Sequence, residues 1–394
     1  MYPALAVLQA IRRKFNIDES ISKPDATGNN GLHRIFPSNQ LSVLWVGGRG
    51  GMEANLVKRT GVEYQEIPAA GVHGVGGRAL PSNAWQIVKG VKASRQIIRS
   101  YQPDIMFFTG GYVAVPMALA GRYPGRGLPK PFNLLFVPDI EPGLALKTLA
   151  RFADQIALCV DDSKAFFARR NQLITTGYPL RSELARWSVM ANRRSEAMKV
   201  FDLSPQLPTL LVFGGSKGAR SINRALMAIL PDLLKEMQII HICGQTDWPI
   251  VQADYQNQVS MLPGDRSKRY HLFAYLHEDM GAAMSAANLA VSRAGASILG
   301  ELTAFELPAI LVPYPYAWRY QQMNARYLER KGAALIVEDA RLEIELLSKI
   351  RSLIQDPQRL QDMQRCLHSL SQPGAAEKLA DLIINLPRAR GGAS

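Results

Sequence analysis

The chain has 394 residues, 47% of them hydrophobic and 20% charged, which is typical of a soluble protein with two domains. Its 46 Lys and Arg outnumber its 33 Asp and Glu, and the net charge of +13 favours anionic lipid, nucleic acid or phosphorylated substrates as partners, or simply a basic surface. Three widely spaced cysteines and the lack of a long apolar stretch argue against a disulfide framework, a zinc site and a transmembrane segment.

The chain opens directly on a helical pattern, with Pro3 placed to suit the first turn. A doubly wound domain has a strand and a turn before such a helix, so we expect the N-terminal sheet to be one strand short. Residues 17–40 are polar and rich in Gly, Pro, Ser and Asn, and they predict a surface loop.

Short, nearly continuous apolar runs then alternate with helical patterns, which is typical of parallel strands buried on both faces. The first set of predicted strands comprises 41–46, 104–108, 133–137 and 156–160, and the second comprises 209–213, 239–243, 288–291, 309–312 and 334–337. The polar stretch 185–207 separates the two sets. The predicted fold class is therefore α/β, with two Rossmann-like doubly wound domains and a cleft between them.

Glycine turns follow several of these strands, and the most developed one is Gly214–Gly218, which an amphipathic helix follows. Backbone amides at such a helix N-terminus suit a phosphate, and glycine allows its close approach. Similar turns lie at 47–51 and 109–112. None has the spacing GxGxxG or GxxxxGK[ST], which disfavours a nicotinamide or flavin enzyme and a P-loop ATPase.

A second constellation follows the predicted strand 288–291. Glu301 lies in the first two turns of the next helix, where a carboxylate could accept both hydroxyls of a ribose or simply be a solvated helix residue. Further on, the amides of Gln321 and Gln322 match sugar hydroxyls, although isolated glutamines are usually surface groups.

Taken together, these segments resemble a known family, the bacterial transferases of glycosyltransferase family 28 that add N-acetylglucosamine (GlcNAc) to undecaprenyl-pyrophosphoryl-N-acetylmuramoyl-pentapeptide in peptidoglycan synthesis. The matching segments occur in the family's order: Tyr2-Pro3-Ala4-Leu5-Ala6, Gly50-Gly51-Met52-Glu53, Thr109-Gly110-Gly111-Tyr112-Val113, Pro142-Gly143-Leu144, Thr176-Gly177-Tyr178-Pro179-Leu180-Arg181, Gly214-Gly215-Ser216-Lys217-Gly218-Ala219, Ser292-Arg293-Ala294-Gly295-Ala296 and Gln321–Ala325. Each segment alone is a weak signal, whereas their order and spacing together are specific.

The resemblance implies the GT-B fold and an inverting transfer of GlcNAc from UDP-GlcNAc without a metal or another cofactor. It implies an acceptor and membrane domain over 1–180 and a UDP-sugar domain over 181–372. A C-terminal helix over 373–387 would return to the N-terminal domain, and 388–394 would be a tail, which we expect to be disordered.

The resemblance also assigns site residues. Those expected to face the donor diphosphate are Arg181, Gly214, Gly215, Ser216 and Gly218. Those expected to form the rest of the donor pocket are Arg293, Gly295 and Ala296 at the nucleotide, Glu301 at the ribose, Gln321 and Gln322 at GlcNAc, and the backbone of Leu276 or His277 at uracil. Those expected at the acceptor pyrophosphate are Thr109, Gly110, Gly111 and Tyr112.

The sequence departs from the family on the acceptor side. The family's first glycine loop, which ends in a histidine proposed to help catalysis, precedes Tyr2-Pro3, and the given sequence begins after it. The family's His-Glu-Gln-Asn is replaced by Phe136-Val137-Pro138-Asp139. Candidates for the catalytic base are therefore Asp139 and His73, the latter weighed against a solvated loop histidine.

Three explanations remain open at this point. The chain is part of a longer protein; or it acts on another lipid acceptor, such as a diacylglycerol, with Asp139 as base; or it is a non-catalytic, donor-binding subunit that needs a partner. We favour the first, because the missing piece is a whole strand and loop.

Residues 85–101 combine apolar and basic positions at helical spacing. Such a helix can lie on anionic lipid, or it can simply cover a sheet with a solvated basic face. The predicted membrane face consists of Trp85, Lys89, Lys92, Arg95 and Arg99. We expect a cytoplasmic protein peripheral to the inner face of the cell membrane, and no nucleic-acid partner, because no recognition motif is present.

Overall fold

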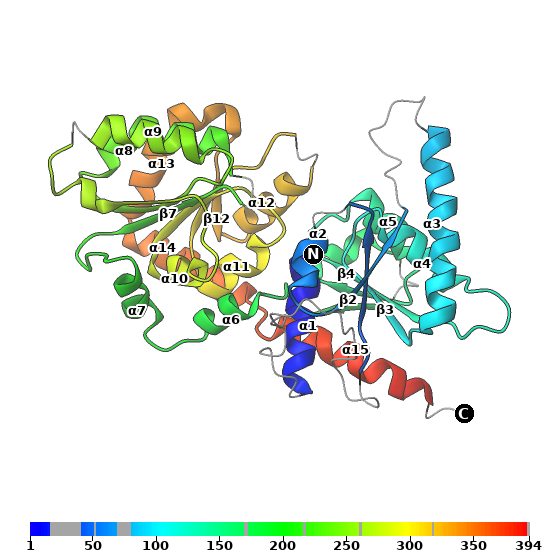
Figure 1. Cartoon of the computed structure of the whole chain (residues 1–394). Coiled ribbons are helices and arrows are strands. Elements are labelled where there is room, and N and C mark those ends of the chain that lie inside the picture. The colour runs from blue at the N-terminus through cyan, green and yellow to red at the C-terminus, as the bar shows by residue number, and fades with distance from the viewer. Residues whose placement is uncertain are drawn as a thin grey trace, which may run out of the picture. The chain divides into compact units, whose positions relative to one another are not determined.

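The computed structural model describes residues 1–15, 41–50, 53–68, 80–168, 172–215, 218–259, 262–316 and 319–391. It divides into two compact units, which Figure 1 shows. Unit 1 comprises Met1–Val137, Pro142–Pro179 and Ala376–Ser394, and unit 2 comprises Pro138–Glu141 and Leu180–Ala375. The predicted loop 17–40 lies outside the described residues.

Unit 1 alternates helices and strands. Its elements are α1 (Tyr2–Lys14), β1 (Leu44–Gly48), α2 (Glu53–Lys58), β2 (Glu63–Ile67), α3 (Leu80–Tyr101), β3 (Ile105–Phe108), α4 (Ala114–Arg122), β4 (Phe132–Val137), α5 (Leu144–Ala150), β5 (Gln155–Leu158), the 3₁₀ helix η3 (Asp161–Phe166), β6 (Gln172–Thr175) and α15 (Ala375–Gly391). The last of these helices runs to Gly391, so the residues from 388 that were expected to form a disordered tail begin as helix.

The strands of unit 1 form two parallel ladders. One pairs β1 with β2, and the other has the order β3-β4-β5-β6. Within the described residues no ladder joins the two, so the sheet that the sequence predicts as one domain-wide layer is in two parts. All six residues of β4 are buried, and all of them except Asn133 are apolar.

Helix α15 belongs to unit 1 although it ends the chain. Two ion pairs connect it to α1: Arg13 lies 2.8 Å from Glu377, and Lys14 lies 2.8 Å from Asp381. The four side chains are between 35% and 53% exposed, so solvent screens both pairs and each contributes on the order of 0 to 1 kcal/mol to stability. Leu379 and Ala380 of α15 are fully buried, so the helix also buries apolar side chains.

Unit 2 also alternates helices and strands. Its elements are α6 (Ser182–Ser188), α7 (Arg193–Val200), β7 (Thr209–Phe213), α8 (Arg220–Leu233), β8 (Gln238–Ile242), α9 (Trp248–Val259), the 3₁₀ helix η4 (Ser267–Arg269), β9 (Tyr270–Phe273), α10 (Met280–Ala286), β10 (Leu289–Ser292), α11 (Ile298–Phe305), β11 (Ala309–Leu311), α12 (Tyr320–Arg330), β12 (Ala334–Ile336), the 3₁₀ helix η5 (Asp339–Arg341), α13 (Leu342–Ile354) and α14 (Pro357–Leu370).

The six strands of unit 2 form one parallel sheet in the order β12-β11-β10-β7-β8-β9. Starting from β7, the chain builds outward through β8 and β9, then crosses back and builds outward the other way through β10, β11 and β12. This is the doubly wound order with its topological switch point between β7 and β10, where ligands bind in such sheets. The predicted parallel α/β architecture is confirmed for this unit.

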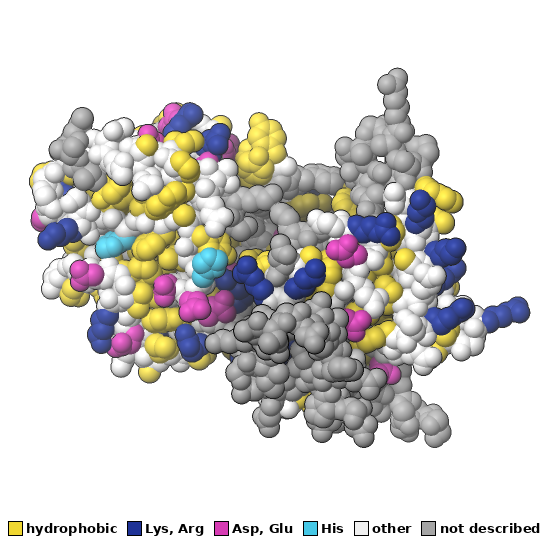
Figure 2. Space-filling model, in the orientation of Figure 1, with side chains coloured by type: hydrophobic (Ala, Val, Ile, Leu, Met, Phe, Trp, Pro, Cys, Tyr) yellow, Lys and Arg dark blue, Asp and Glu magenta, His cyan; other side chains and the backbone are white. Residues whose placement is uncertain are grey.

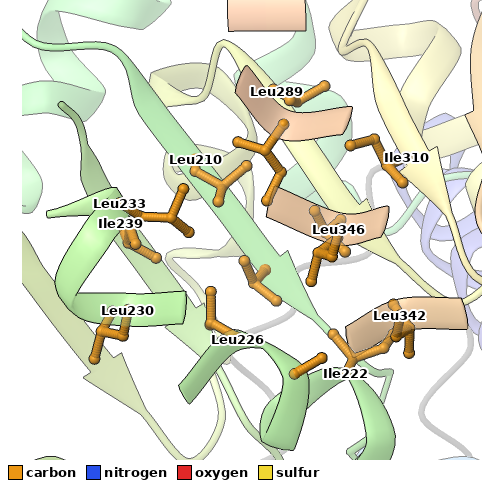
Figure 3. Packing of buried hydrophobic residues seen from close by; sticks show 14 of the residues in the cluster. Leu210, Ile222, Leu226, Leu230, Leu233, Ile239, Leu289, Ile310, Leu342 and Leu346 are labelled. Carbon is orange, nitrogen blue, oxygen red and sulfur yellow. The ribbon is translucent and has the colours of Figure 1, made fainter. Parts of the chain in front are cut away.

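The core of unit 2 lies between the sheet and the helices α8 and α13, as Figure 3 shows. Helix α8 places Ile222, Leu226, Leu230 and Leu233 at three- and four-residue spacing, so all four side chains share one face. That face packs on strand residues such as Leu210, and full burial of each leucine stabilises the fold by about 1.5–3 kcal/mol. The packing fixes the start of α8 relative to the sheet edge.

None of the described helices is long and apolar enough to span a membrane.

Candidate active site

The switch point of unit 2 brings two predicted segments together. Strands β7 and β10 are direct neighbours, with Phe213 opposite Ser292 at their carboxyl ends. The glycine turn follows β7, and the loop with Gly295 and Ala296 follows β10. Both glycine and alanine are partly exposed there, so the two loops face the same edge of the sheet with accessible backbone.

The glycine turn is built by close packing. Gly218 has φ +81°, and a Cβ atom at this position would lie 2.3 Å from the carbonyl oxygen of Cys243, so no other residue fits without a shift. Its amide donates to the carbonyl of Gly215 over 3.0 Å, which closes the turn. Gly215 itself is exposed, and Ser216 lies outside the described residues.

Helix α8 begins directly after this turn, and no side chain caps its N-terminus. The N-cap residue is Ala219, which has no group that could accept a hydrogen bond from the first-turn amides. Those amides and the helix dipole therefore present partial positive charge at the carboxyl edge of the sheet. This is the geometry that holds a phosphate.

Arg293 ties three segments of the pocket together. Its guanidinium donates to the carbonyl of Val312 at 3.2 Å and to Ser221 Oγ at 2.7 Å, and it forms an ion pair with Asp339. Its side chain is only 10% exposed, and its guanidinium carbon lies 5.2 Å above the ring of Tyr314. Because both Nη atoms make these contacts, Arg293 shapes the pocket by holding the loops after β10 and β11 against α8.

Glu301 lies on α11 and is held in place by Ser297, whose hydroxyl donates to Glu301 Oε2 over 3.0 Å. Burial raises the pKa of the Glu301 carboxyl, whereas the hydrogen bond from Ser297 and the charge of Arg181 lower it. The charge of Arg181 is therefore close enough to influence the Glu301 carboxyl, although the two residues were predicted from separate motifs. Arg181 also lies 3.2 Å from Glu183 on α6, a helix that begins one residue after Arg181.

The glutamines lie at the start of α12. Gln321 Oε1 accepts a 2.9 Å hydrogen bond from the amide of Tyr314, while Gln322 follows it on the helix and is also partly exposed. Successive residues on a helix point about 100° apart, so Gln321 shares its side of the helix with residue 324 and not with Gln322. The residue at 324 is a buried asparagine whose importance the motif alone did not show.

Asn324 joins three segments and has every amide atom engaged. Its Nδ2 donates to Asp139 Oδ1 at 2.9 Å and to the carbonyl of Ala294 at 3.1 Å, and its Oδ1 accepts from the amide of Ile140 at 3.1 Å. Residues 138–141, which follow β4 in the chain, thereby belong to unit 2. Burial raises the pKa of the Asp139 carboxyl, and the hydrogen bond from Asn324 partly opposes the shift.

The remaining predicted donor residues lie between β9 and α10. Leu276 is buried and His277 is exposed, with its ring 4.6 Å from that of Tyr275. In unit 1, the predicted acceptor turn follows β3. Gly111 has φ +88° with open space where a Cβ atom would be, and Tyr112 is 41% exposed.

That turn also includes Thr109, which is partly exposed, and Gly110, which has φ +105°. The candidate base His73 lies outside the described residues. Among the residues that the structure does describe, no three His, Cys, Asp or Glu side chains gather as a metal site requires.

Helix α3 presents its predicted basic face to solvent. Lys89, Lys92, Arg95 and Arg99 are all exposed, and Figure 2 shows Lys and Arg side chains gathered where Figure 1 places α3. Trp85 is 59% exposed, and the Lys89 ammonium lies 5.4 Å from the centre of its ring. Residues on the opposite side of the helix, such as Ile98, are buried, so α3 also covers its sheet.

Two family models match the chain, the glycosyltransferase family 28 N-terminal domain over residues 32–128 and the corresponding C-terminal domain over residues 209–382. Curated relatives named UDP-N-acetylglucosamine--N-acetylmuramyl-(pentapeptide) pyrophosphoryl-undecaprenol N-acetylglucosamine transferase match over nearly their whole length. The relative from Roseiflexus sp. (strain RS-1) is 40% identical over 98% of this chain and 92% of its own. The relative from Desulforamulus reducens is 31% identical over 97% and 94%.

Solved structures agree on the fold. The crystal structure of MurG from Acinetobacter baumannii superposes with a TM-score of 0.70 at 24% identity, covering 97% of this chain and 95% of that one. The UDP-GlcNAc 2-epimerase from Neisseria meningitidis, solved with UDP-GlcNAc bound, gives 0.59 at 11% identity, covering 87% and 91%. The predicted GT-B architecture is thereby confirmed, and the alternatives of a different lipid acceptor or a non-catalytic subunit are not favoured. The chain belongs to glycosyltransferase family 28, among the N-acetylglucosamine transferases of peptidoglycan synthesis.

Proposed function

We propose that the chain transfers GlcNAc from UDP-GlcNAc to undecaprenyl-pyrophosphoryl-N-acetylmuramoyl-pentapeptide, with inversion at the anomeric carbon. The observation that carries this proposal is the switch point of unit 2. There the uncapped N-terminus of α8 lies at the same sheet edge as the loop that leads to Glu301. An anion site beside a carboxylate is what a nucleoside diphosphate sugar requires.

The donor is recognised by groups that unit 2 holds in fixed orientations. The amides of α8 and the guanidinium of Arg181 take the diphosphate, and Glu301 accepts the ribose hydroxyls. Gln321 and Gln322 bind the GlcNAc hydroxyls, and the backbone near Leu276 and His277 meets the uracil edge.

The reaction develops charge that these groups stabilise. The acceptor hydroxyl oxygen forms a bond to the anomeric carbon, the bond between that carbon and the phosphate oxygen breaks, and UDP leaves with the electron pair. Negative charge builds on the departing diphosphate, where the α8 amides and Arg181 stabilise it without reorganising.

The hydroxyl proton needs a base, and Asp139 is our candidate. Its pKa is raised by burial, which moves a carboxyl toward the range of effective general bases at neutral pH. Asn324 fixes its Oδ1 atom, so the side chain has a defined orientation. Asp139→Asn should therefore lower kcat for GlcNAc transfer and leave the KM for UDP-GlcNAc nearly unchanged.

In unit 1 we assign the acceptor pyrophosphate to the turn formed by Thr109, Gly110, Gly111 and Tyr112. Open space at Gly111 allows an anion to approach the backbone there. Helix α3 supplies the surface for an anionic membrane, because basic side chains flank an exposed tryptophan on one face. This surface supports our proposal that the enzyme acts at the cytoplasmic side of the cell membrane, where it would reach a lipid-linked acceptor.

The proposal is tested by measuring GlcNAc transfer from UDP-GlcNAc to a soluble lipid-linked muramoyl-pentapeptide analogue, with a diacylglycerol as the competing acceptor. Transfer to the muramoyl acceptor alone supports the proposal, and transfer only to the diacylglycerol contradicts it. The same assay on a version extended by a family-type first strand and glycine–histidine loop reports on the catalytic base. Equal transfer rates for the two versions point to Asp139, whereas a much faster transfer by the extended version points to the added histidine.

A further inference from the structure

A chain of polar side chains runs through the core of unit 2, behind the glycine turn. His241 lies in the middle of it and is fully buried, on a strand whose five residues are all buried. A buried polar side chain is costly unless its hydrogen bonds are satisfied. All of its bonds are satisfied here, and their partners lead from the core to the beginning of α8.

The hydrogen bonds connect β8, β9, α8 and the loop that precedes α9. His241 Nδ1 on β8 lies 2.7 Å from the hydroxyl of Tyr270 on β9, and His241 Nε2 lies 3.0 Å from Asn223 Oδ1 on α8. Asn223 Nδ2 donates to the carbonyl of Cys243 at 2.9 Å and to Asp247 Oδ2 at 3.0 Å. Asp247, which precedes α9, accepts at Oδ1 from Arg220 Nε at 3.2 Å.

The carbonyl of Cys243 and the carboxylate of Asp247 accept only, and this decides which atom of Asn223, His241 and Tyr270 donates in each hydrogen bond. Asn223 must direct its NH₂ group to the Cys243 carbonyl and the Asp247 carboxylate, which leaves Oδ1 toward His241. His241 therefore carries its proton on Nε2 and accepts from Tyr270 at Nδ1. Burial lowers the pKa of His241 to about 3, so the imidazole stays neutral and keeps this tautomer at neutral pH.

The same groups hold the glycine turn. The carbonyl of Cys243 that accepts from Asn223 is also the atom against which Gly218 is packed. Arg220, at the other end, is the first residue of α8. The polar chain thus fixes both the last glycine of the turn and the first residue of the helix whose amides face the edge of the sheet.

We propose that His241 is a positioning residue of the donor site, which acts through Asn223 to hold the glycine turn and the start of α8 in the conformation that binds the diphosphate. The inference rests on the proposed function, because it assumes that this turn holds UDP-GlcNAc. Without the imidazole, Asn223 Oδ1 loses the donor that holds it from the side of the core, and the contacts of the same amide to Cys243 and Asp247 loosen with it.

The sequence offers a matched control on the same strand. Gln238, at the opposite end of β8, is also buried, and its amide donates to Ser204, Leu207 and Thr209. Gln238→Leu and His241→Leu each remove a buried polar group from β8, but only His241 is connected to the glycine turn. His241→Gln retains a donor that can reach Asn223 and serves as the rescue variant.

The measurement is the Kd of UDP-GlcNAc by calorimetry on the full chain, together with KM and kcat for transfer and the melting temperature. We expect His241→Leu to raise the Kd and KM about tenfold, as expected for the loss of about one hydrogen bond, and to leave kcat within about twofold. His241→Gln and Gln238→Leu should stay close to the unaltered chain in Kd. Tyr270→Phe, which keeps its ring against Tyr255, should weaken binding in the same direction.

Equal Kd values for His241→Leu and Gln238→Leu, at comparable losses of melting temperature, would overturn the inference and leave His241 a core residue only. If His241→Leu does not fold, unchanged binding by Tyr270→Phe and His241→Gln overturns it, whereas weaker binding by Tyr270→Phe alone supports it. Failure of the unaltered chain to bind UDP-GlcNAc contradicts the proposed function itself, and this outcome is distinct from the others.

Discussion

Gln321 Oε1 accepts a 2.9 Å hydrogen bond from the backbone amide of Tyr314, a residue whose ring lies against the guanidinium of Arg293. Because the oxygen of the amide is engaged, the NH₂ group is the part of Gln321 that can donate to a ligand. The loop between β11 and α12 therefore orients the glutamine, and Arg293 in turn steadies the loop. Arg293, which was predicted to contact the nucleotide, and Gln321, which was predicted to contact the sugar, are thus linked through their contacts with Tyr314.

Replacing Gln321 by Glu separates these two tasks. Glutamate keeps an oxygen for the Tyr314 amide but cannot donate to a sugar hydroxyl, so we expect the KM for UDP-GlcNAc to rise about tenfold, the equivalent of one lost hydrogen bond. Steady-state kinetics with varied UDP-GlcNAc measures this. An unchanged KM would exclude Gln321 from the sugar site, and Gln322→Glu tests the neighbouring amide independently.

Glu301→Ala should weaken the binding of both UDP and UDP-GlcNAc, because the carboxylate is assigned to the ribose that the two ligands share. Loss of a hydrogen bond to a charged group corresponds to about 1.5–3 kcal/mol, or about 10- to 150-fold in Kd. Calorimetric titration provides the test. Glu306→Ala, at the end of the same helix, is the control, since this residue pairs with His368. Equal losses at both positions would point to damage to α11 and not to ribose recognition.

The ion pair of Arg293 with Asp339 should stabilise unit 2 against unfolding, besides holding the loops of the donor pocket in place. Their side chains are 10% and 24% exposed, and Ser221 donates to the same Asp339 oxygen over 2.7 Å. Asp339→Ala leaves the arginine charge without its carboxylate, which costs about 3 kcal/mol for buried pairs. We expect a lower urea midpoint for unit 2, and a midpoint unchanged from that of the unaltered chain would show that solvent replaces the carboxylate.

The strands that the sequence predicts best are those buried on both faces. The stretch 209–213 matches β7 residue for residue, and its neighbours in the sheet agree within one residue. The strands that were missed, β2, β6 and β9, each lie at the edge of a ladder. In β2, for example, Glu63 and Glu66 are exposed, so the strand has no continuous apolar run to detect.

The site shows the same division between local and distant information. Glu301 and Gln321 stand in short motifs whose chemistry can be read from neighbouring residues. The contact of Asp139 with Asn324 spans 185 positions in the sequence, and that of Ser221 with Asp339 spans 118. Hydrogen bonds of this kind depend on which strands become neighbours, and no spacing along the chain encodes that.

The basic face of α3 should bind anionic vesicles. Each Lys or Arg close to an anionic surface contributes about 1 kcal/mol, so changing Lys89, Lys92, Arg95 and Arg99 to Gln should lower the partition coefficient by about two orders of magnitude or more. The effect should shrink as salt is added, because the attraction is screened. Co-sedimentation with vesicles that contain anionic lipid measures this.

The control for the membrane prediction removes the same charge elsewhere. Four exposed cations of unit 2 serve for this purpose: Arg224, Arg330, Lys331 and Arg365. If both sets of changes reduce vesicle binding equally, the overall positive charge attracts the lipid and α3 is not a specific face. Trp85→Ala adds a second test, since an exposed tryptophan should insert at the interface and its loss should weaken binding at high salt as well.

His241 should make the stability of the protein fall as the pH is lowered. Burial lowers its pKa from 6.5 to about 3, so between these values the unfolded chain takes up a proton that the folded protein excludes. The contribution of His241 to the free energy of unfolding is therefore fully present above about pH 6.5, and below this pH it declines by about 1.4 kcal/mol per pH unit. Tyr270, the titratable group in contact with the ring, has a pKa raised by burial and stays neutral throughout this range.

Comparing the unaltered chain with His241→Gln isolates the pH-dependent contribution of His241, because the carboxylates titrate alike in the two proteins. From pH 7 to pH 5 the unaltered chain should lose about 2 kcal/mol more unfolding free energy than the variant, since glutamine takes up no proton in either state. Urea unfolding at the two pH values measures the difference. Parallel losses would mean that the imidazole is protonated within the folded protein, which would break the hydrogen bond that Nδ1 accepts from Tyr270 and contradict the neutral tautomer assigned to His241.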